Sequence, residues 1–215
     1  SEKIEPSNYK KVLKNSDAIL VPGGFGDRGI EGMILAARFA RENEVPYFGI
    51  CLGLQIAIIE MARNLLDLKD ANSTEFKPRT KNKVISLVTE WKNEDGTIEK
   101  RDKNSDKGGT MRLGAQKASL LNGSLARSLY KRKTIFERHR HRYEVNPDYI
   151  PMLENKGLIV SARSEVHDLV EMIELKDHPW FLGCQFHPEF TSKPKIGHPL
   201  FNDFIKTAVE LKKKK

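Results

Sequence analysis

The sequence has little cysteine and no long apolar run. Cys51 and Cys184 are the only cysteines among 215 residues, too few for a disulfide framework or a cysteine zinc site. No stretch approaches 18 consecutive apolar residues, and the N-terminus resembles neither a signal peptide nor a transit peptide, so we expect a cytoplasmic protein that makes no membrane contact. With 39% hydrophobic residues the chain is also too apolar to be disordered.

Acidic residues are in the minority. There are 29 of them against 37 lysines and arginines, which gives a formal net charge of +8. The excess is local, because it comes from the four lysines 212–215 and from segment 131–142, which has six basic residues and one acid. A chain that is close to neutral elsewhere is not typical of a general nucleic-acid binder.

Apolar runs alternate with helical periodicity in the first third of the chain. Residues 17–21 and 45–50 are predicted as buried strands, and residues 29–43 and 52–65 as helices. This order predicts an α/β fold with a mostly parallel central sheet flanked by helices. Further strands are expected at 84–88, 111–118, 135–145, 158–162, 170–175 and 181–186, and helices at 147–156 and 199–211. Segment 93–109, with its Glu-Asp-Gly turn signal and dense charges, is expected to be a hairpin tip or a mobile loop. We expect a single domain over residues 1–211 and a disordered lysine tail at 212–215.

The most informative motif is Gly49-Ile50-Cys51-Leu52-Gly53, between the second predicted strand and the second helix. Glycines two residues on either side of a nucleophile permit the strained turn called a nucleophile elbow. The helix N-terminus should stabilise a Cys51 thiolate, and the free amide of Leu52 is a candidate oxyanion donor. A buried structural cysteine is the alternative for Cys51, and we favour it for Cys184.

A cysteine nucleophile requires a base, and the base requires an orienting group. His187 follows the strand predicted at 181–186, and Glu189 stands two positions further on, so this pair is a candidate base and carboxylate. The His-Pro dipeptide by itself is weak, since His178 and His198 also precede proline.

These motifs, together with the glycine loop at 21–26, resemble the class I (triad) glutamine amidotransferases, which have a flavodoxin-like fold. The segments at 70–76, 108–114, 137–146 and 185–190 are similar to the glutaminase domains of the CTP synthase family. Members begin with a strand, a helix and a second strand that we do not find before residue 17, so we expect that part of the sheet to be missing.

The resemblance implies a role for each matching residue. Cys51 would attack the side-chain amide of L-glutamine, His187 would carry the proton, and Glu189 would orient His187. The amides of Gly24 and Leu52 would hold the oxyanion, at about 3 kcal/mol each. The resemblance also implies the glutamine-binding residues, which are Gly24, Leu52, Gly53, Leu54, Gln55, Glu75 and Arg142, with Glu75 at the α-ammonium and Arg142 at the α-carboxylate.

The resemblance also implies partners outside this sequence. In the family, ammonia passes to a covalently linked amidoligase (synthetase) domain, which uses ATP and Mg²⁺ to aminate UTP to CTP in pyrimidine biosynthesis. GTP activates the glutaminase step, and the full-length enzyme is expected to be a homo-tetramer. No cofactor or metal is expected in this domain, and the loop at 93–109 with Arg101 is the expected lid and a weak candidate for the GTP response.

Two other hypotheses remain open. A cysteine hydrolase for γ-glutamyl peptides would use the same chemistry on another substrate. A nucleic-acid-binding module would use Arg138 and Arg140 of the basic segment, but that segment lacks interleaved stacking aromatics beyond Tyr143.

Overall fold

A seven-stranded sheet forms the centre of the computed structural model, which describes residues 1–87, 90–92, 98–100 and 111–214. Spatial order differs from chain order, because the last strand lies between the second and the eleventh. In spatial order the strands are β1 (Ile19–Val21), β2 (Tyr47–Ile50), β12 (Phe181–Cys184), β11 (Val170–Leu175), β10 (Leu158–Ser164), β7 (Arg112–Leu120) and β8 (Thr134–His141).

The sheet is mixed. Strands β1, β2 and β12 are mutually parallel, whereas every pairing from β12 to β8 is antiparallel. The α/β class that we predicted is confirmed, but the sheet is less parallel than predicted. The prediction was based on the two strand–helix units at the start of the chain, while β10, β11 and β12 follow one another through short connections that suit antiparallel neighbours.

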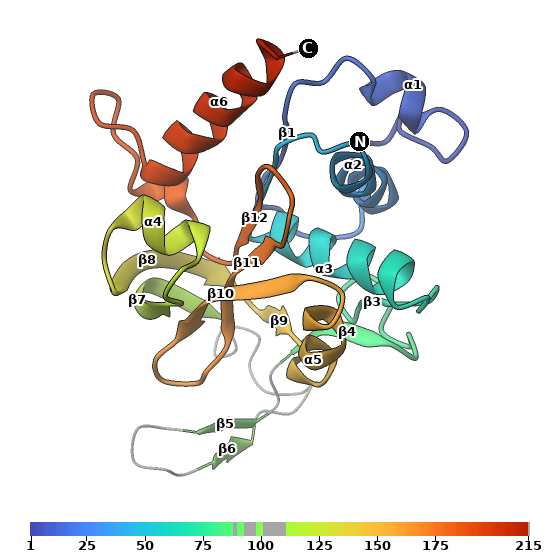
Figure 1. Ribbon diagram of the computed structural model, residues 1–215. Coiled ribbons are helices and arrows are strands. Elements are labelled where there is room, and N and C mark those ends of the chain that lie inside the picture. Colours follow the sequence, from blue (N-terminus) through green and yellow to red (C-terminus); the bar gives the residue numbers. More distant parts are fainter. Residues whose placement is uncertain (88–89, 93–97, 101–110, 215) are drawn as a thin grey trace.

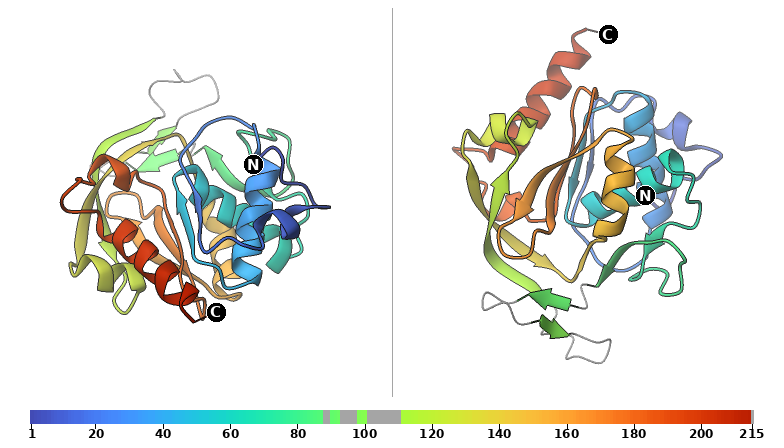
Figure 2. Two further views of the ribbon diagram at one scale, coloured as in Figure 1. Left: turned by 90° about the horizontal axis from the view of Figure 1, so that it is seen from above. Right: turned by 60° about the horizontal axis from the view of Figure 1, so that its bottom comes forward.

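Helices cover both faces of this sheet (Figures 1 and 2). Helices α2 (Ile30–Glu42) and α3 (Leu52–Leu65) pack against each other and over β1 and β2, with α1 (Tyr9–Leu13) outside α2. Helix α5 (Ile150–Glu154), preceded by the 3₁₀ turn η1 (Pro147–Tyr149), packs on β10 and α3. Helices α4 (Leu125–Tyr130) and α6 (Pro199–Lys212) contact each other on the opposite side. The short α1 is an element that we did not predict.

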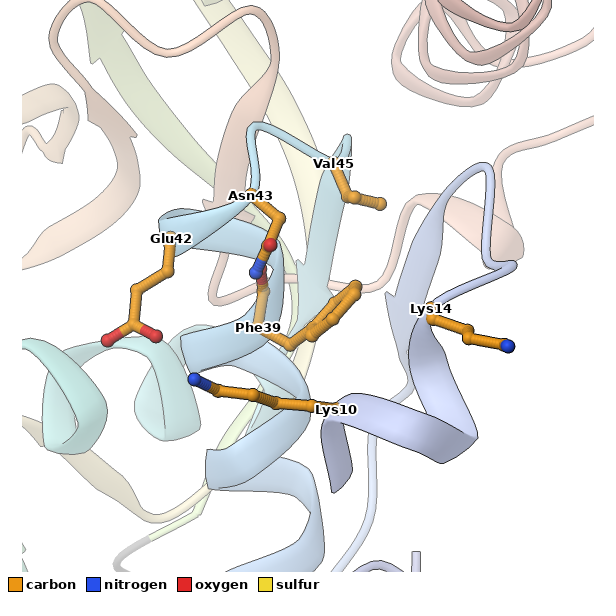
Figure 3. Close-up of a pocket in the computed structure, with 6 residues that line it drawn as sticks. All are labelled: Lys10, Lys14, Phe39, Glu42, Asn43 and Val45. Atoms are coloured by element: carbon orange, nitrogen blue, oxygen red, sulfur yellow. The ribbon is translucent and has the colours of Figure 1, made fainter. Parts of the chain in front are cut away.

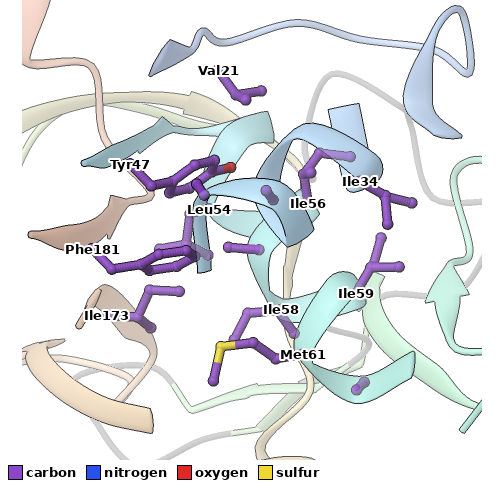
Figure 4. Close-up of a cluster of buried hydrophobic side chains, with 14 of the residues drawn as sticks. Val21, Ile34, Tyr47, Leu54, Ile56, Ile58, Ile59, Met61, Ile173 and Phe181 are labelled. Carbon is purple, nitrogen blue, oxygen red and sulfur yellow. The ribbon is translucent and has the colours of Figure 1, made fainter. Parts of the chain in front are cut away.

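Two hydrophobic clusters lie on the two faces of the sheet. Successive strand residues point to opposite faces, so Tyr47 and Phe181 belong to the cluster under α2 and α3, and Phe48 and Leu182 to the cluster under α4 and α6. Figure 4 shows the first cluster, in which the rings of Tyr47 and Phe181 stack at 4.5 Å beside Leu54. Helix α3 is buried from Leu52 to Ala62, which holds the turn before it in a fixed position.

Two smaller sheets complete the structure. One joins β3 (Asn72–Ser73), β4 (Lys83–Leu87) and β9 (Tyr143–Val145), and the other joins β5 (Glu90–Lys92) and β6 (Ile98–Lys100). Within the loop predicted at 93–109, residues 93–97 and 101–109 lie outside the described residues, so the interpretation of Arg101 as part of a lid remains a prediction.

The strand predicted at 135–145 breaks at Arg142. From Ile135 to His141 the alternation holds, with inward residues buried and Arg138 and Arg140 exposed. Beyond Arg142 the chain leaves β8 and pairs with β4, and Glu144 is buried. If one strand continued from Ile135 to Val145, strict alternation would place Glu144 on the same side as Arg138 and Arg140. The bend therefore separates Arg142 from the other two arginines.

Helix α6 extends one residue beyond the predicted boundary at 211 and includes Lys212. The Lys212 ammonium contacts the Asp17 carboxylate at 2.7 Å, and cations are favourable at a helix C-terminus. Residues 213–214 form a turn, and the disorder of the lysine tail stays a prediction. Among the described residues no helix is long and apolar enough to span a bilayer.

Candidate active site

Cys51 occupies a strained turn between β2 and α3. Its φ of +51° and ψ of −99° lie in a region that non-glycine residues rarely adopt. The flanking glycines make the turn possible: a Cβ at Gly49 would lie 2.5 Å from the Gly53 carbonyl, and a Cβ at Gly53 would lie 2.2 Å from the Val21 oxygen. The elbow geometry that the motif predicts is therefore present.

His187 and Glu189 reach this turn because β12 lies beside β2. In the parallel register Cys184 is opposite Ile50, so the residues that follow both strands emerge at the same edge of the sheet. A Cβ at Gly23 would lie 2.7 Å from His187 Cε1 and 3.6 Å from Cys51 Cβ. The imidazole and the Cys51 side chain thus adjoin the same glycine.

Three contacts hold His187, two through its ring and one through its backbone. Its Nδ1 is 2.6 Å from Glu189 Oε1, its backbone N–H donates to the Arg138 carbonyl at 2.8 Å, and the Phe190 ring stacks on it with centroids 4.9 Å apart. Burial raises the pKa of Glu189, but the hydrogen bond with His187, a backbone hydrogen bond and the charges of His187 and His198 together outweigh burial, so the net pKa is lowered. Nε2 of His187 is buried and has no hydrogen-bond partner among the described residues, so it is available to a reacting group.

The environment of the sulfur opposes the thiolate that the helix N-terminus is expected to stabilise. Burial raises the pKa of Cys51 to about 12, and the charges of Glu144, Glu189 and Glu75 act in the same direction. The hydrogen bond from the Leu52 amide lowers the pKa by a smaller amount. The free site thus holds a thiol, because desolvation exceeds the effect of the helix N-terminus.

The glycine loop before α2 lies against the elbow. A Cβ at Gly24 would meet Leu52 Cδ2 at 3.1 Å, so the two predicted oxyanion donors belong to neighbouring residues. Gly26 N–H donates to Glu75 Oε1 at 2.9 Å, which ties the loop to the segment after β3. Burial raises the pKa of Glu75, and the Gly26 bond and the charge of Arg142 oppose that rise. Glu75 and Arg142, predicted on opposite ends of a zwitterion, are thus within electrostatic reach of each other.

The remaining predicted glutamine-binding residues lie in the first turn of α3. Gln55 is buried, and its Nε2 donates to the Tyr143 carbonyl at 3.0 Å and to Gln185 Oε1 at 3.4 Å. The Gly53 carbonyl accepts from the Tyr47 hydroxyl at 2.8 Å. Leu54 packs its side chain into the core, and its amide donates to the Cys51 carbonyl. Gly53 and Leu54 therefore shape the turn through their backbone.

Several side chains near the site were missed from the sequence. Gln185 is fully buried, with Nε2 3.7 Å from Cys51 Sγ, and it lies beside a buried network of Arg112, Glu144 and Glu171. His139 and His141 join that network through Glu171 and Glu144. The sequence signal for His139 and His141 was their position on the inward side of the strand predicted at 135–145, whereas Glu144 would fall on the outward side of that strand.

A hollow on the described surface lies away from Cys51 and His187. It has a volume of about 570 Å³ and lies between α1 and the end of α2, lined by Lys10, Lys14, Phe39, Glu42, Asn43 and Val45 (Figure 3). It contains none of the predicted site residues. Within the described ranges, no group of three or more His, Cys, Asp or Glu side chains is arranged to hold a metal ion.

The class of protein follows from the elbow, the mixed sheet and a family match. Residues 2–207 match the glutamine amidotransferase class-I family, so the chain belongs to that family. It matches the glutaminase domain of Trypanosoma brucei CTPS, solved with bound acivicin, at 37% identity and a TM-score of 0.85, covering 97% of this chain and 78% of the other. The chain is thus a class-I domain closely similar to the CTP synthase glutaminase domain.

More distant structures share the fold alone. A GMP synthase subunit protein, described as putative, from Thermoplasma acidophilum has 16% identity and a TM-score of 0.57, covering 95% of this chain and 78% of the other. A glutamine amidotransferase from Methylobacillus flagellatus has 15% identity and a TM-score of 0.50, covering 82% and 53%.

Proposed function

We propose that this domain hydrolyses L-glutamine to glutamate and ammonia through a γ-glutamyl thioester on Cys51. The proposal rests on one observation. The His187 ring and the Cys51 side chain both lie against Gly23, and Cys51 occupies a strained elbow. A nucleophile beside a base that is itself oriented by a carboxylate is the arrangement used for acyl transfer.

In this mechanism His187 moves the proton. Its Nε2 removes the Cys51 proton as sulfur attacks the amide carbon, and then delivers that proton to the departing ammonia. Glu189, bound to Nδ1 at 2.6 Å, keeps Nε2 in the acceptor tautomer and stabilises the imidazolium. Because the free thiol has a raised pKa, the thiolate forms together with the imidazolium when substrate is bound.

The oxyanion and the substrate are held by groups around the elbow. The amides of Leu52 and Gly24 would stabilise the negative oxygen, since first-turn amides have no intrahelical partner. The Glu75 carboxylate would bind the α-ammonium and the Arg142 guanidinium the α-carboxylate. Their electrostatic proximity supports a ligand that bears both charges on one carbon. Both N–H groups of Gln55 are used by protein acceptors, so its carbonyl oxygen is the group left to meet substrate.

The similarity to the CTP synthase glutaminase domain supports a wider context. We infer that the ammonia aminates UTP to CTP in a covalently linked amidoligase domain that uses ATP and Mg²⁺. The full-length enzyme would be a cytoplasmic homo-tetramer of pyrimidine biosynthesis, activated by GTP, with no cofactor in the glutaminase domain and no nucleic-acid partner.

Ammonia release tests the proposal. The chain should release ammonia from L-glutamine, and Cys51→Ser and Cys51→Ala should reduce the rate to background. Cys184→Ser is the matched control, because Cys184 is buried in β12 and its thiol donates to the Phe186 carbonyl. If the chain hydrolysed γ-glutamyl peptides in preference to glutamine, the result would contradict the proposal and support the γ-glutamyl peptide hydrolase instead. Equal loss of activity in Cys184→Ser would remove the special role of Cys51.

A further inference from the structure

The side chain of Gln185 fills the space between the Cys51 sulfur and Gln55. Because Cys184 is opposite Ile50 in the parallel pair β12 and β2, Gln185 and Cys51 leave the two strands side by side. Gln185 has no exposed surface, and its Nε2 lies 3.7 Å from Cys51 Sγ, within hydrogen-bonding reach of sulfur.

The direction of this contact is fixed by a chain of hydrogen bonds. The backbone carbonyl of Tyr143 can only accept, so the group of Gln55 that faces it is the amide NH₂. The same NH₂ donates to Gln185 Oε1 at 3.4 Å, which directs the Gln185 NH₂ to the sulfur. If the Gln185 amide were rotated by half a turn, its NH₂ would face the NH₂ of Gln55, and its carbonyl oxygen would face the Cys51 sulfur.

Rigid elements hold both ends of the chain. The Gln185 backbone N–H donates to the Glu171 carbonyl of β11 at 2.8 Å. Gln55 belongs to the first turn of α3, and its N–H donates to the Cys51 carbonyl at 3.3 Å. The amide is therefore positioned before substrate arrives, which is the condition for electrostatic stabilisation without reorganisation.

The sulfur needs such a donor. Carboxylates face it from three elements: Glu144 of β9, Glu189 of the turn η2 (Pro188–Phe190) and Glu75 after β3. The Leu52 amide opposes them in the free site, but in the proposed mechanism its N–H donates to the oxyanion once the tetrahedral intermediate has formed. The Gln185 amide is the donor that stays with the sulfur through both steps.

We propose that Gln185 is a further catalytic residue, whose amide N–H donates to the Cys51 sulfur and stabilises the thiolate when it attacks and when it leaves. In the first step the C–S bond forms, the C–N bond breaks, and the thiol proton passes through His187 to ammonia. In the second step water attacks the thioester carbon and the C–S bond breaks. The returning thiolate regains its proton through His187, and Gln185 transfers none. This role rests on the proposed function, because that function requires the thiolate.

Alkylation of the whole chain by iodoacetamide measures the thiolate without glutamine recognition. The variants are Gln185→Met, which removes the donor at similar size, and Gln185→Glu, which retains the shape and presents a carboxylate. Gln116→Met is the matched control, because it makes the same substitution at a glutamine of β7 whose side chain contacts Arg112. Rates are followed by intact mass between pH 6 and 10, with Cys51→Ser giving the contribution of Cys184 and thermal melting reporting the fold.

We expect both Gln185 variants to alkylate at least fivefold more slowly than wild type at pH 8, with profiles displaced to higher pH and kcat for glutamine lowered more than KM is raised. Gln116→Met should match wild type. Wild-type alkylation in either folded Gln185 variant would overturn the proposal. The proposed function is judged separately, since a wild-type chain that releases no ammonia refutes it and with it the catalytic role of Gln185, whatever the alkylation rates.

Discussion

His187 Nδ1 and Glu189 Oε1 lie 2.6 Å apart although Pro188 alone separates the two residues in the chain. Pro188 begins the 3₁₀ turn η2, and its fixed φ favours the tight turn that brings the carboxylate back to the ring. The predicted base and its predicted orienting group thus come from three consecutive residues that follow β12.

Replacing Glu189 with glutamine should lower kcat for glutamine hydrolysis by roughly 10²-fold. The amide oxygen can still accept from Nδ1, but the negative charge that stabilises the imidazolium is lost. We expect a smaller loss in kcat than in an enzyme whose triad carboxylate is fully buried. The reason is that 42% of the Glu189 side chain is exposed, so solvent screens its charge. Initial rates of ammonia release check this, and a rate equal to wild type would show that Glu189 is not the orienting group.

Adding one methyl group at Gly23 should disrupt the site. In Gly23→Ala the new Cβ would lie 2.7 Å from His187 Cε1, closer than real contacts allow, so the ring must move away from Cys51. We expect kcat to fall by roughly 10²-fold, the loss associated with about 1 Å of misplacement, with little change in melting temperature. Gly24→Ala is the comparison, since its Cβ meets only a Leu52 methyl at 3.1 Å and the amide is retained. A greater loss in Gly24→Ala would contradict this assignment.

Thr191 anchors the turn that follows His187. Its hydroxyl donates to Glu137 Oε2 at 3.1 Å, and Glu137 Oε1 is bonded by Tyr130 and by His198 at the start of α6. Thr191→Val should lower kcat several-fold with KM nearly unchanged, because the loss of one hydrogen bond of about 1 kcal/mol loosens the turn. Thr191→Ser keeps the hydroxyl and should behave as wild type. Equal activity of the valine and serine variants would exclude the anchoring role.

The buried Glu144 should make stability depend on pH. Burial alone would raise its pKa, but His141 and Arg112 lower it from 4.5 to about 2. A carboxyl with a lowered folded pKa stabilises the fold fully above its unfolded pKa. That contribution, about 3 kcal/mol, is lost as pH falls from about 4.5 towards 2. Urea unfolding should therefore show that the free energy of unfolding of Glu144→Gln is lower than that of wild type at pH 7, and that this difference is smaller at pH 3.

An exposed carboxylate provides the control for this prediction. Glu165→Gln removes a group that pairs with Lys117 at the surface, where solvent screening leaves little stabilisation, so its unfolding free energy should stay near wild type. A Glu144→Gln deficit of the same size at pH 3 and pH 7 would contradict the ionised, paired state of Glu144.

The local parts of the site were predictable from the sequence. The elbow at Cys51 depends on two glycines within four residues of chain, and the pairing of His187 with Glu189 depends on one intervening proline. Strand and helix positions followed from apolar periodicity, which placed α2, α3 and α6 within one or two residues. Such features require no knowledge of distant contacts.

The rest depends on packing between distant segments. The insertion of β12 between β2 and β11 brings Gln185 beside Cys51, residues 134 positions apart. The alternation of inward and outward residues along one strand could not predict that Glu144 is buried, because the chain passes from one sheet to another at Arg142. The raised pKa of Cys51 results from the burial of the site and from carboxylates of other elements, whereas the motif alone indicated only the helix N-terminus.

The most direct test is reaction of the chain with a diazo-ketone analogue of glutamine, followed by mass spectrometry of the peptides. The account predicts one adduct per chain on Cys51, prevented by excess L-glutamine, and no adduct on Cys184. Labelling of Cys184 with Cys51 unmodified, or labelling of Cys51 that L-glutamine does not prevent, would contradict the central claim that Cys51 is the nucleophile of a glutamine site.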